Sequence, residues 1–422
     1  MIRSKTTLVV GPGAGLEIEM PGRAELLNKV AQGFDFARLG TELQTRDMQV
    51  LDRYFEKFGR QMGSSGERLK EASQAIRVSA RVGSTVDAIL EQHSHDQMAS
   101  AAAKLALVYY TLQAESRSPL LLEPRDPGDL PLRGTEHWLF HLGRLLTSGV
   151  ARNMADKAFD NLSIINFNYD RSIQHYLPFV VSMAFGLTLN EARTMVGQKL
   201  NITHPLGNAG RLPWEPGENP DVEWGNEEPW NLHNLVKEIQ TASERMRNRQ
   251  YVTALQAAIA GSKKIIFLGF DFDPATIDFL FDYSLSHDPD VIAVTQGMNE
   301  ATQSAAYRLL RRRTGIEGDN LISMLDMRRF NFMRDYALFL ESLRASAIVT
   351  SRGLQSYGEA PYGLTRPARQ AGNREHRRKC PNSITTSSLL AQVPAACALR
   401  AFPPATGPRW RLPRNIAWAA PA

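Results

Sequence analysis

Cysteine is scarce in this chain of 422 residues, and long apolar runs are absent. Both cysteines, Cys380 and Cys397, lie near the C-terminus, so residues 1–349 hold no thiol for a zinc site or a disulfide framework. No stretch approaches the length of about 18 apolar residues that a membrane-spanning helix needs. The first apolar run, residues 8–10, is too short for a secretory signal. These absences predict a cytoplasmic protein with no zinc and no membrane partner.

Acidic residues are scarce only at the C-terminal end. Of the 49 Lys and Arg residues, 11 lie in residues 350–422, where only 2 of the 44 Asp and Glu residues lie. Residues 1–349 therefore carry a small excess of acidic groups, and nucleic-acid binding, which needs a basic surface, is expected only of the tail. Residues 346–422 are rich in Pro, Arg and Ala without apolar periodicity, and we expect them to be disordered. The abrupt change of composition fits a genuine tail as well as a shifted reading frame.

A short apolar strand near the N-terminus runs directly into a turn with three glycines, Gly11-Pro-Gly-Ala-Gly15. In open α/β sheets this order presents backbone amides to a phosphate group, because glycine permits tight bends and close approach of a ligand. The spacing is not that of the Gly-x-Gly-x-x-Gly fingerprint, and an ordinary tight turn after a buried strand is the alternative.

Short apolar segments alternate with helical patterns over the rest of residues 1–345. The strand-like segments are 8–10, 162–168, 263–269, 290–295 and 320–325; the helical patterns are 46–78 (with a break at 63–66), 84–90, 98–115, 136–154, 189–199, 232–260, 274–283, 299–313 and 331–343. This alternation predicts an α/β fold with a Rossmann-like parallel sheet, helices on both faces, and a helical insertion at about 46–155. Ligands of such sheets bind beyond the carboxyl ends of the strands, where residues 11–15, 166–170 and 269–273 fall.

Four segments in this order resemble the bacterial sirtuin-like family, which uses NAD as substrate or ligand. The segments are Gly11-Pro-Gly-Ala-Gly15 with Pro21, Asn166-Phe-Asn-Tyr-Asp170, Thr203-His-Pro-Leu-Gly207 and Phe267-Leu-Gly-Phe270. Residues 84–90 are similar to a further stretch of stand-alone bacterial members. The resemblance covers roughly residues 5–343 and leaves the tail outside.

The resemblance implies that NAD lies across the carboxyl edge of the sheet. Gly11, Gly13, Ala14 and Gly15 would approach its pyrophosphate through backbone amides. Gly269 and Phe270 would lie near the adenosine half of NAD. Asn168 would position the nicotinamide ribose or a water molecule, with Asp170 beside the nicotinamide end.

Cleavage of the bond between nicotinamide and ribose requires orientation of the substrate and one general base near neutral pH. Histidine suits that role, since its ordinary pKa is about 6.5. The family's catalytic histidine directly precedes a glycine, but Leu206 stands before Gly207 here, so His204 is the candidate base. A structural or ligand-contacting histidine is the alternative.

Two functions follow as expectations from this resemblance. The first is an NAD+ hydrolase that releases nicotinamide and acts in bacterial anti-phage defence, alone as a homo-oligomer or with a defence-system partner protein. The second is a catalytically inactive module that binds NAD or ADP-ribose as a sensor or scaffold. Sirtuin deacylases carry a four-cysteine zinc module, so the lack of cysteine in residues 1–349 argues against deacylation.

Overall fold

A computed structural model describes residues 1–36, 45–121, 129–132, 134, 136–218, 220–281, 284–318 and 321–343. All of them belong to one compact unit, Met1–Gly358. The tail predicted at 346–422 lies outside the described residues, so its predicted disorder and basic surface stay predictions.

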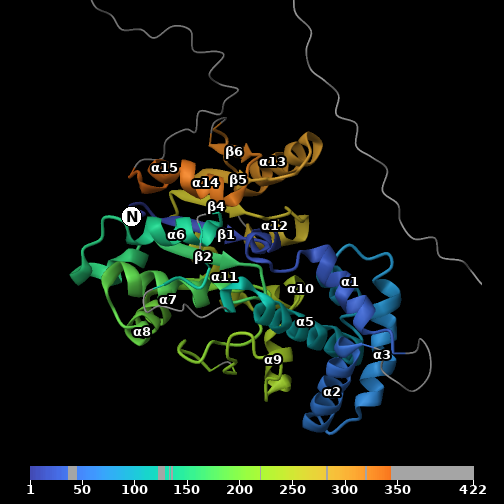
Figure 1. The fold of residues 1–422 in the computed structure, drawn as a ribbon. Helices are drawn as coiled ribbons and strands as arrows, with labels where there is room; N and C mark the ends of the chain where they lie inside the picture. The colour runs from blue at the N-terminus through green and yellow to red at the C-terminus, as the bar shows by residue number, and fades with distance from the viewer. Residues whose placement is uncertain are drawn as a thin grey trace, which may run out of the picture. The chain divides into compact units, whose positions relative to one another are not determined.

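The described strands form a single parallel sheet in the order β3-β2-β1-β4-β5-β6 (Figure 1). The strands are β1 (Thr6–Val10), β2 (Leu162–Asn166), β3 (Asn201–Thr203), β4 (Lys264–Leu268), β5 (Asp290–Val294) and β6 (Ile322–Leu325). β1 pairs in parallel with both β2 and β4, so the strand order reverses direction between β1 and β4. The fold is therefore Rossmann-like, and the predicted α/β class is confirmed.

Helices cover both faces of the sheet because the strands are apolar on both sides. Successive residues of a strand face opposite ways, and Val9 belongs to one core whereas Leu8 and Val10 belong to the other. The core around Val9 contains side chains of α1 (Arg23–Gly33), α5 (Gln97–Arg117), α9 (Leu232–Glu238), α11 (Arg249–Ile259), α12 (Pro274–Leu280) and α13 (Glu300–Thr314). The opposite core contains side chains of α6 (Trp138–Thr147), the short helix η3 (Arg152–Phe159), α7 (Ser172–Phe185), α8 (Leu189–Lys199), α14 (Arg329–Asp335) and α15 (Ala337–Glu341).

Between β1 and β2 the chain forms a group of helices centred on α5. This helix packs against α2 (Arg46–Gln61), α3 (Gly66–Ser79) and α4 (Val86–Gln92), and Figure 1 shows α2 and α3 beside α1 at one side of the sheet. Every residue of α5 from 101 to 115 is buried, which explains why its sequence is mostly apolar on every face. No helix of the described ranges combines the length and apolarity of a membrane span.

Several predicted elements differ from the structure in extent. The predicted helix over 232–260 is three helices, because Thr241 and Asn248 cap the starts of α10 (Ala242–Met246) and α11. The predicted helix over 136–154 ends at Thr147. The helix α7, with Pro178 in its interior, and the short edge strand β3 were not predicted.

Candidate functional site

The glycine turn after β1 packs directly onto the end of β4. A Cβ atom at Gly11 would lie 2.6 Å from the carbonyl oxygen of Gly269, and one at Gly13 would lie 2.8 Å from the same oxygen. Gly269 has a φ of +60°, and a Cβ there would lie 2.1 Å from the backbone nitrogen of Ala14. Glycine is therefore required on both sides of this contact, which joins the two strand ends that flank the reversal of strand order.

The backbone amides of this turn donate within the protein. Gly11 donates to the carbonyl of Leu268 and Gly13 to that of Gly269, each at 2.9 Å, and Ala14 donates to the carbonyl of Gly11, also at 2.9 Å. Pro12 has no N–H group. In this arrangement the amides of Gly11, Gly13 and Ala14 already have acceptors within the protein, and the contact between the turn and a pyrophosphate stays a prediction.

A cavity of about 260 Å³, here called the β4 cavity, lies between the glycine turn and the carboxyl ends of β4 and β5. Its lining includes Gly13, Gly269, Asp271 and two arginines, Arg23 and Arg329. Phe270 contributes to this wall, but its ring lies in an aromatic cluster 5.4 Å from the ring centroids of its neighbours Phe167, Phe267 and Phe272.

The two arginines lie beside carboxylates and bring guanidinium N–H donors to this crevice. Arg329, at the start of α14, is 7% exposed; its Nη1 donates to Gln296 and lies 4.0 Å from Glu17, and its Nε has no partner. The Nη2 of Arg329 would lie 3.0 Å from a Cβ at Gly13, so the guanidinium lies over the glycine turn. Arg23 pairs with Asp271 at 2.7 Å, and its Nε is also unpartnered.

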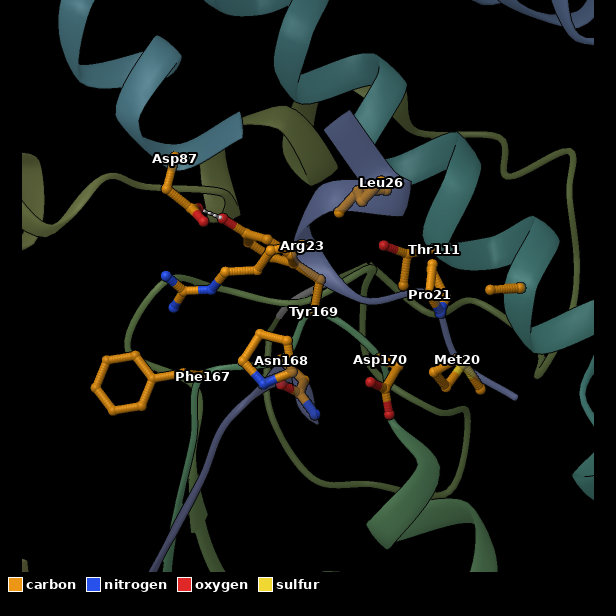
Figure 2. Close-up of a pocket in the computed structure, with 12 residues that line it drawn as sticks. Met20, Pro21, Arg23, Leu26, Asp87, Thr111, Phe167, Asn168, Tyr169 and Asp170 are labelled. Atoms are coloured by element: carbon orange, nitrogen blue, oxygen red, sulfur yellow. Dashed lines mark hydrogen bonds between the residues drawn. The ribbon is translucent and has the colours of Figure 1, made fainter. Parts of the chain in front are cut away.

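A second, smaller cavity of about 50 Å³, here called the β2 cavity, lies on the other side of the glycine turn. Figure 2 shows Asn168 and Asp170 at its floor, with Pro21 and Arg23 opposite them. Both cavities are lined by Pro12 and Arg23, so they flank the same turn. The volume holds a few water molecules. A larger group enters only if a lining side chain such as Met20 moves.

Asn168 presents an unused acceptor to the end of β2. The side chain is 8% exposed, and its Oδ1 has no hydrogen-bond partner. Its Nδ2 would lie 4.0 Å from a Cβ at Gly15, which places the amide beside the glycine turn. The turn after β2 is stabilised by Asn166 instead, whose Oδ1 accepts from the backbone N–H of Asn168 at 3.2 Å. The side-chain oxygen of Asn168 therefore takes no part in stabilising this turn.

Asp170 and Tyr169 tie the end of β2 to neighbouring helices. The Oδ1 of Asp170 accepts from the backbone N–H of Ser172 at 3.1 Å and from its hydroxyl, at the start of α7. Burial raises the pKa of Asp170, and the bonds from Ser172 oppose that rise. The hydroxyl of Tyr169 donates to Asp87 in α4, as the dashed line in Figure 2 marks.

His204 lies behind Asn168, with both ring nitrogens bonded. Its Nδ1 lies 2.9 Å from the backbone carbonyl of Asn168 and its Nε2 lies 2.8 Å from Nε2 of Gln174. The carbonyl accepts only, so Nδ1 carries the proton and Nε2 accepts from the amide of Gln174. Burial lowers the pKa of His204 to about 4, so the ring is neutral at pH 7. The side chains of His204 and Asn168 line different cavities. The hydrogen bond between them joins the His204 ring to the backbone carbonyl of Asn168, not to its side chain.

A fully buried ion pair holds the end of β2 against α5. Arg171 and Glu115 are both 0% exposed, and Nε of Arg171 donates to Glu115 Oε1 at 3.0 Å. The same guanidinium donates to the carbonyl of Val222 at 2.5 Å. Glu115 stands at the end of an apolar helical run, which was a sequence signal for a partnered charge. Sequence reasoning also missed Arg23 and Arg329, and the position of Arg329 shortly after the last strand was the available signal.

No cluster of three or more His, Cys, Asp or Glu side chains that could hold a metal ion occurs among the residues that the structure describes. Comparison with protein-family models and with curated proteins finds no match to this sequence.

Proposed function

We propose that this chain binds NAD+ along the carboxyl edge of its sheet. The observation that carries the proposal is the pair of cavities that flank one glycine turn at the reversal of strand order, which is where Rossmann-like sheets take dinucleotides. A dinucleotide consists of two nucleoside halves joined by a pyrophosphate. The adenosine half would occupy the larger β4 cavity, and the nicotinamide end would face Asn168 and Asp170 in the β2 cavity.

The pyrophosphate would be bound by side chains rather than by the amides of Gly11, Gly13 and Ala14. Arg329 lies over the turn with an unpartnered Nε, and Arg23 lines both cavities. Guanidinium groups bind phosphate oxygens through strong, charge-assisted hydrogen bonds. The family resemblance in the four motifs supports NAD+ as the dinucleotide.

Calorimetric titration of the full chain with NAD+ tests this assignment. Arg329→Met should weaken binding at least about tenfold, since a hydrogen bond to a charged group contributes about 1.5–3 kcal/mol. Arg334→Met is the matched control, because Arg334 lies in the same helix, is exposed, and forms its ion pair with its neighbour Asp335. Equal affinities of the wild type and the Arg329 variant would contradict the proposal.

A second candidate, hydrolysis of the bound NAD+, is favoured by the unpartnered Oδ1 of Asn168. A water molecule held there would form a bond to C1′ of the ribose as the bond to nicotinamide breaks, and the bonding electrons would leave with the nicotinamide nitrogen. The proton of the water would pass to Asp170, which lines the same cavity and whose pKa is raised by burial. His204 acts here as a positioning residue, because both of its nitrogens are bonded.

Nicotinamide release separates the hydrolase from an inactive NAD-binding module. A hydrolase predicts release by the wild type and loss of release in Asn168→Ala and Asp170→Asn with NAD+ binding retained. Binding without any release assigns the chain to the inactive module. If Asp170→Asn keeps full activity while His204→Asn loses it without losing stability, His204 is the base after all. The defence role implied by the resemblance depends on turnover, and cellular NAD measured after induced expression tests it.

A further inference from the structure

A third cavity, here called the β3 cavity, is separate from the crevice around the glycine turn. It measures about 440 Å³ and lies among α7, α8, β3, the loop that follows β3, and the start of α11. It shares no lining residue with the β2 or the β4 cavity. The side chains used below are Gln174, Trp214, Glu215, Arg245 and Tyr251.

Gln174 lines this cavity and carries a buried acceptor with no partner. Gln174 is 2% exposed, and its Oε1 has no hydrogen bond. The identity of this atom follows from its neighbour: Nε2 of His204 is an acceptor, so Gln174 must turn its NH2 group toward the ring and its oxygen elsewhere. A buried oxygen without a donor costs about 1–3 kcal/mol, which a ligand with an N–H group would recover.

The rest of the cavity wall contains aromatic side chains and equal numbers of positive and negative side chains. Trp214 and Tyr251 provide aromatic surface, and the hydroxyl of Tyr251 is buried without a partner. The guanidinium of Arg245 lies 4.5 Å from the centroid of the Tyr251 ring. Two arginines and two glutamates line the cavity, so their formal charges cancel and an uncharged ligand fits better than an anion.

We propose that the β3 cavity binds an uncharged planar heterocycle that carries an amino group, of the size of a nucleobase or nucleoside. The amino group donates to Oε1 of Gln174, and the ring packs against Trp214 and Tyr251. This site is independent of NAD+ binding at the glycine turn.

The test compares adenosine with purine riboside, which lacks the amino group, by calorimetric titration of the full chain. Adenosine should bind at least about tenfold more tightly than purine riboside, because purine riboside has no amino group to donate to Oε1 of Gln174. Gln174→Met should reduce adenosine affinity to that of purine riboside. Tyr251→Leu, which removes the aromatic ring that packs against the ligand at a partly exposed position, should weaken adenosine severalfold and serves if the Gln174 variant does not fold.

The crevice is a competing location for adenosine, and the variants of the β3 cavity separate the two. Adenosine affinity that falls in the Gln174 or Tyr251 variant supports the β3 cavity. The proposal is overturned if adenosine gives no binding at millimolar concentration, if the two ligands bind equally, or if adenosine affinity is unchanged in both β3-cavity variants. None of these outcomes depends on whether NAD+ binds or is hydrolysed.

Discussion

Removal of Arg171 should destabilise the protein more than an ordinary surface substitution. In Arg171→Met the carboxylate of Glu115 stays fully buried and loses its charged partner, although the backbone N–H groups of residue 171 and Gly225 still donate to it. The carbonyl of Val222 also loses a donor. Breaking a buried pair from one side costs about 3–5 kcal/mol. Methionine fills much of the same volume, so the loss reports the uncompensated charge more than a cavity.

The pH dependence of this variant provides a second measurement. Burial raises the pKa of Glu115 and Arg171 opposes that rise, so without the arginine the pKa rises further. The folded state then binds more protons than the unfolded state at pH values between the ordinary and the raised pKa. Its stability therefore increases as the pH falls, and the deficit relative to wild type should be smaller at pH 5 than at pH 8.

Urea unfolding of wild type, Arg171→Met and Arg171→Met/Glu115→Leu at both pH values completes the experiment. The double variant removes both charges and should recover part of the lost free energy, since apolar replacements of buried pairs are often neutral. A loss below about 1 kcal/mol in the single variant, or a double variant less stable than the single one, would refute this reasoning.

Two further predictions concern the glycine turn and His204. Gly269→Ala should lower the free energy of unfolding by at least about 2 kcal/mol, because a Cβ at this position meets the backbone of Ala14. Gly63→Ala is the control: Gly63 has a similar φ of +64° but nothing lies within 4 Å of its Cβ position, so the loss should be only about 1 kcal/mol. Equal losses would show that strain, not contact, dominates. The stability of the wild type should fall as the pH falls from 6.5 to 4, because the unfolded chain binds a proton that folded His204, with its pKa of about 4, does not. Removing this ring should reduce the total loss of stability between pH 6.5 and pH 4 by about 3 kcal/mol. His204→Asn keeps a donor for the Asn168 carbonyl, and an unchanged pH profile of unfolding in this variant would contradict the assignment.

Apolar runs predicted most of the sheet because its strands are buried on both faces. Within the predicted segments, residues 8–10, 265–268 and 291–294 are continuous apolar runs, and each lies within a strand. The edge strand β3 has three residues and is partly exposed, so it leaves no periodic pattern. Helix α7 escaped prediction because Pro178 interrupts its pattern, although the surrounding core accommodates it.

The break in the helical pattern at 63–66 was predicted, and α2 and α3 do end and begin there. The sequence also signals a break within 232–260, because Thr241 is followed three residues later by Glu244 and the two residues form a capping box. The apolar periodicity across this stretch outweighed that signal. Local capping residues therefore deserve more weight than the continuity of an apolar face.

The candidate site was predictable in place but not in its bonding. The carboxyl ends of parallel strands meet at one edge of the sheet, and this rule alone predicts that Gly11, Asn168 and Gly269 lie close together. Which amides of the turn are free depends on the carbonyls of Leu268 and Gly269, which reach the turn only through tertiary packing. The tautomer of His204 likewise depends on Gln174, in a helix that the sequence pattern did not predict.

The network from Gln174 through His204 to Asn168 determines what each cavity can do. Because Nδ1 of His204 donates to the carbonyl of Asn168, Nε2 must accept, and the oxygen of Gln174 must face away from the ring. One tautomer thus accounts both for a histidine whose two ring nitrogens are bonded and for an unpaired acceptor on Gln174, which lines the β3 cavity. Substituting His204 by asparagine, which bonds only the carbonyl, should leave the amide of Gln174 free to reverse. Adenosine should then lose its preference over purine riboside, because either orientation of the amide becomes accessible to the ligand.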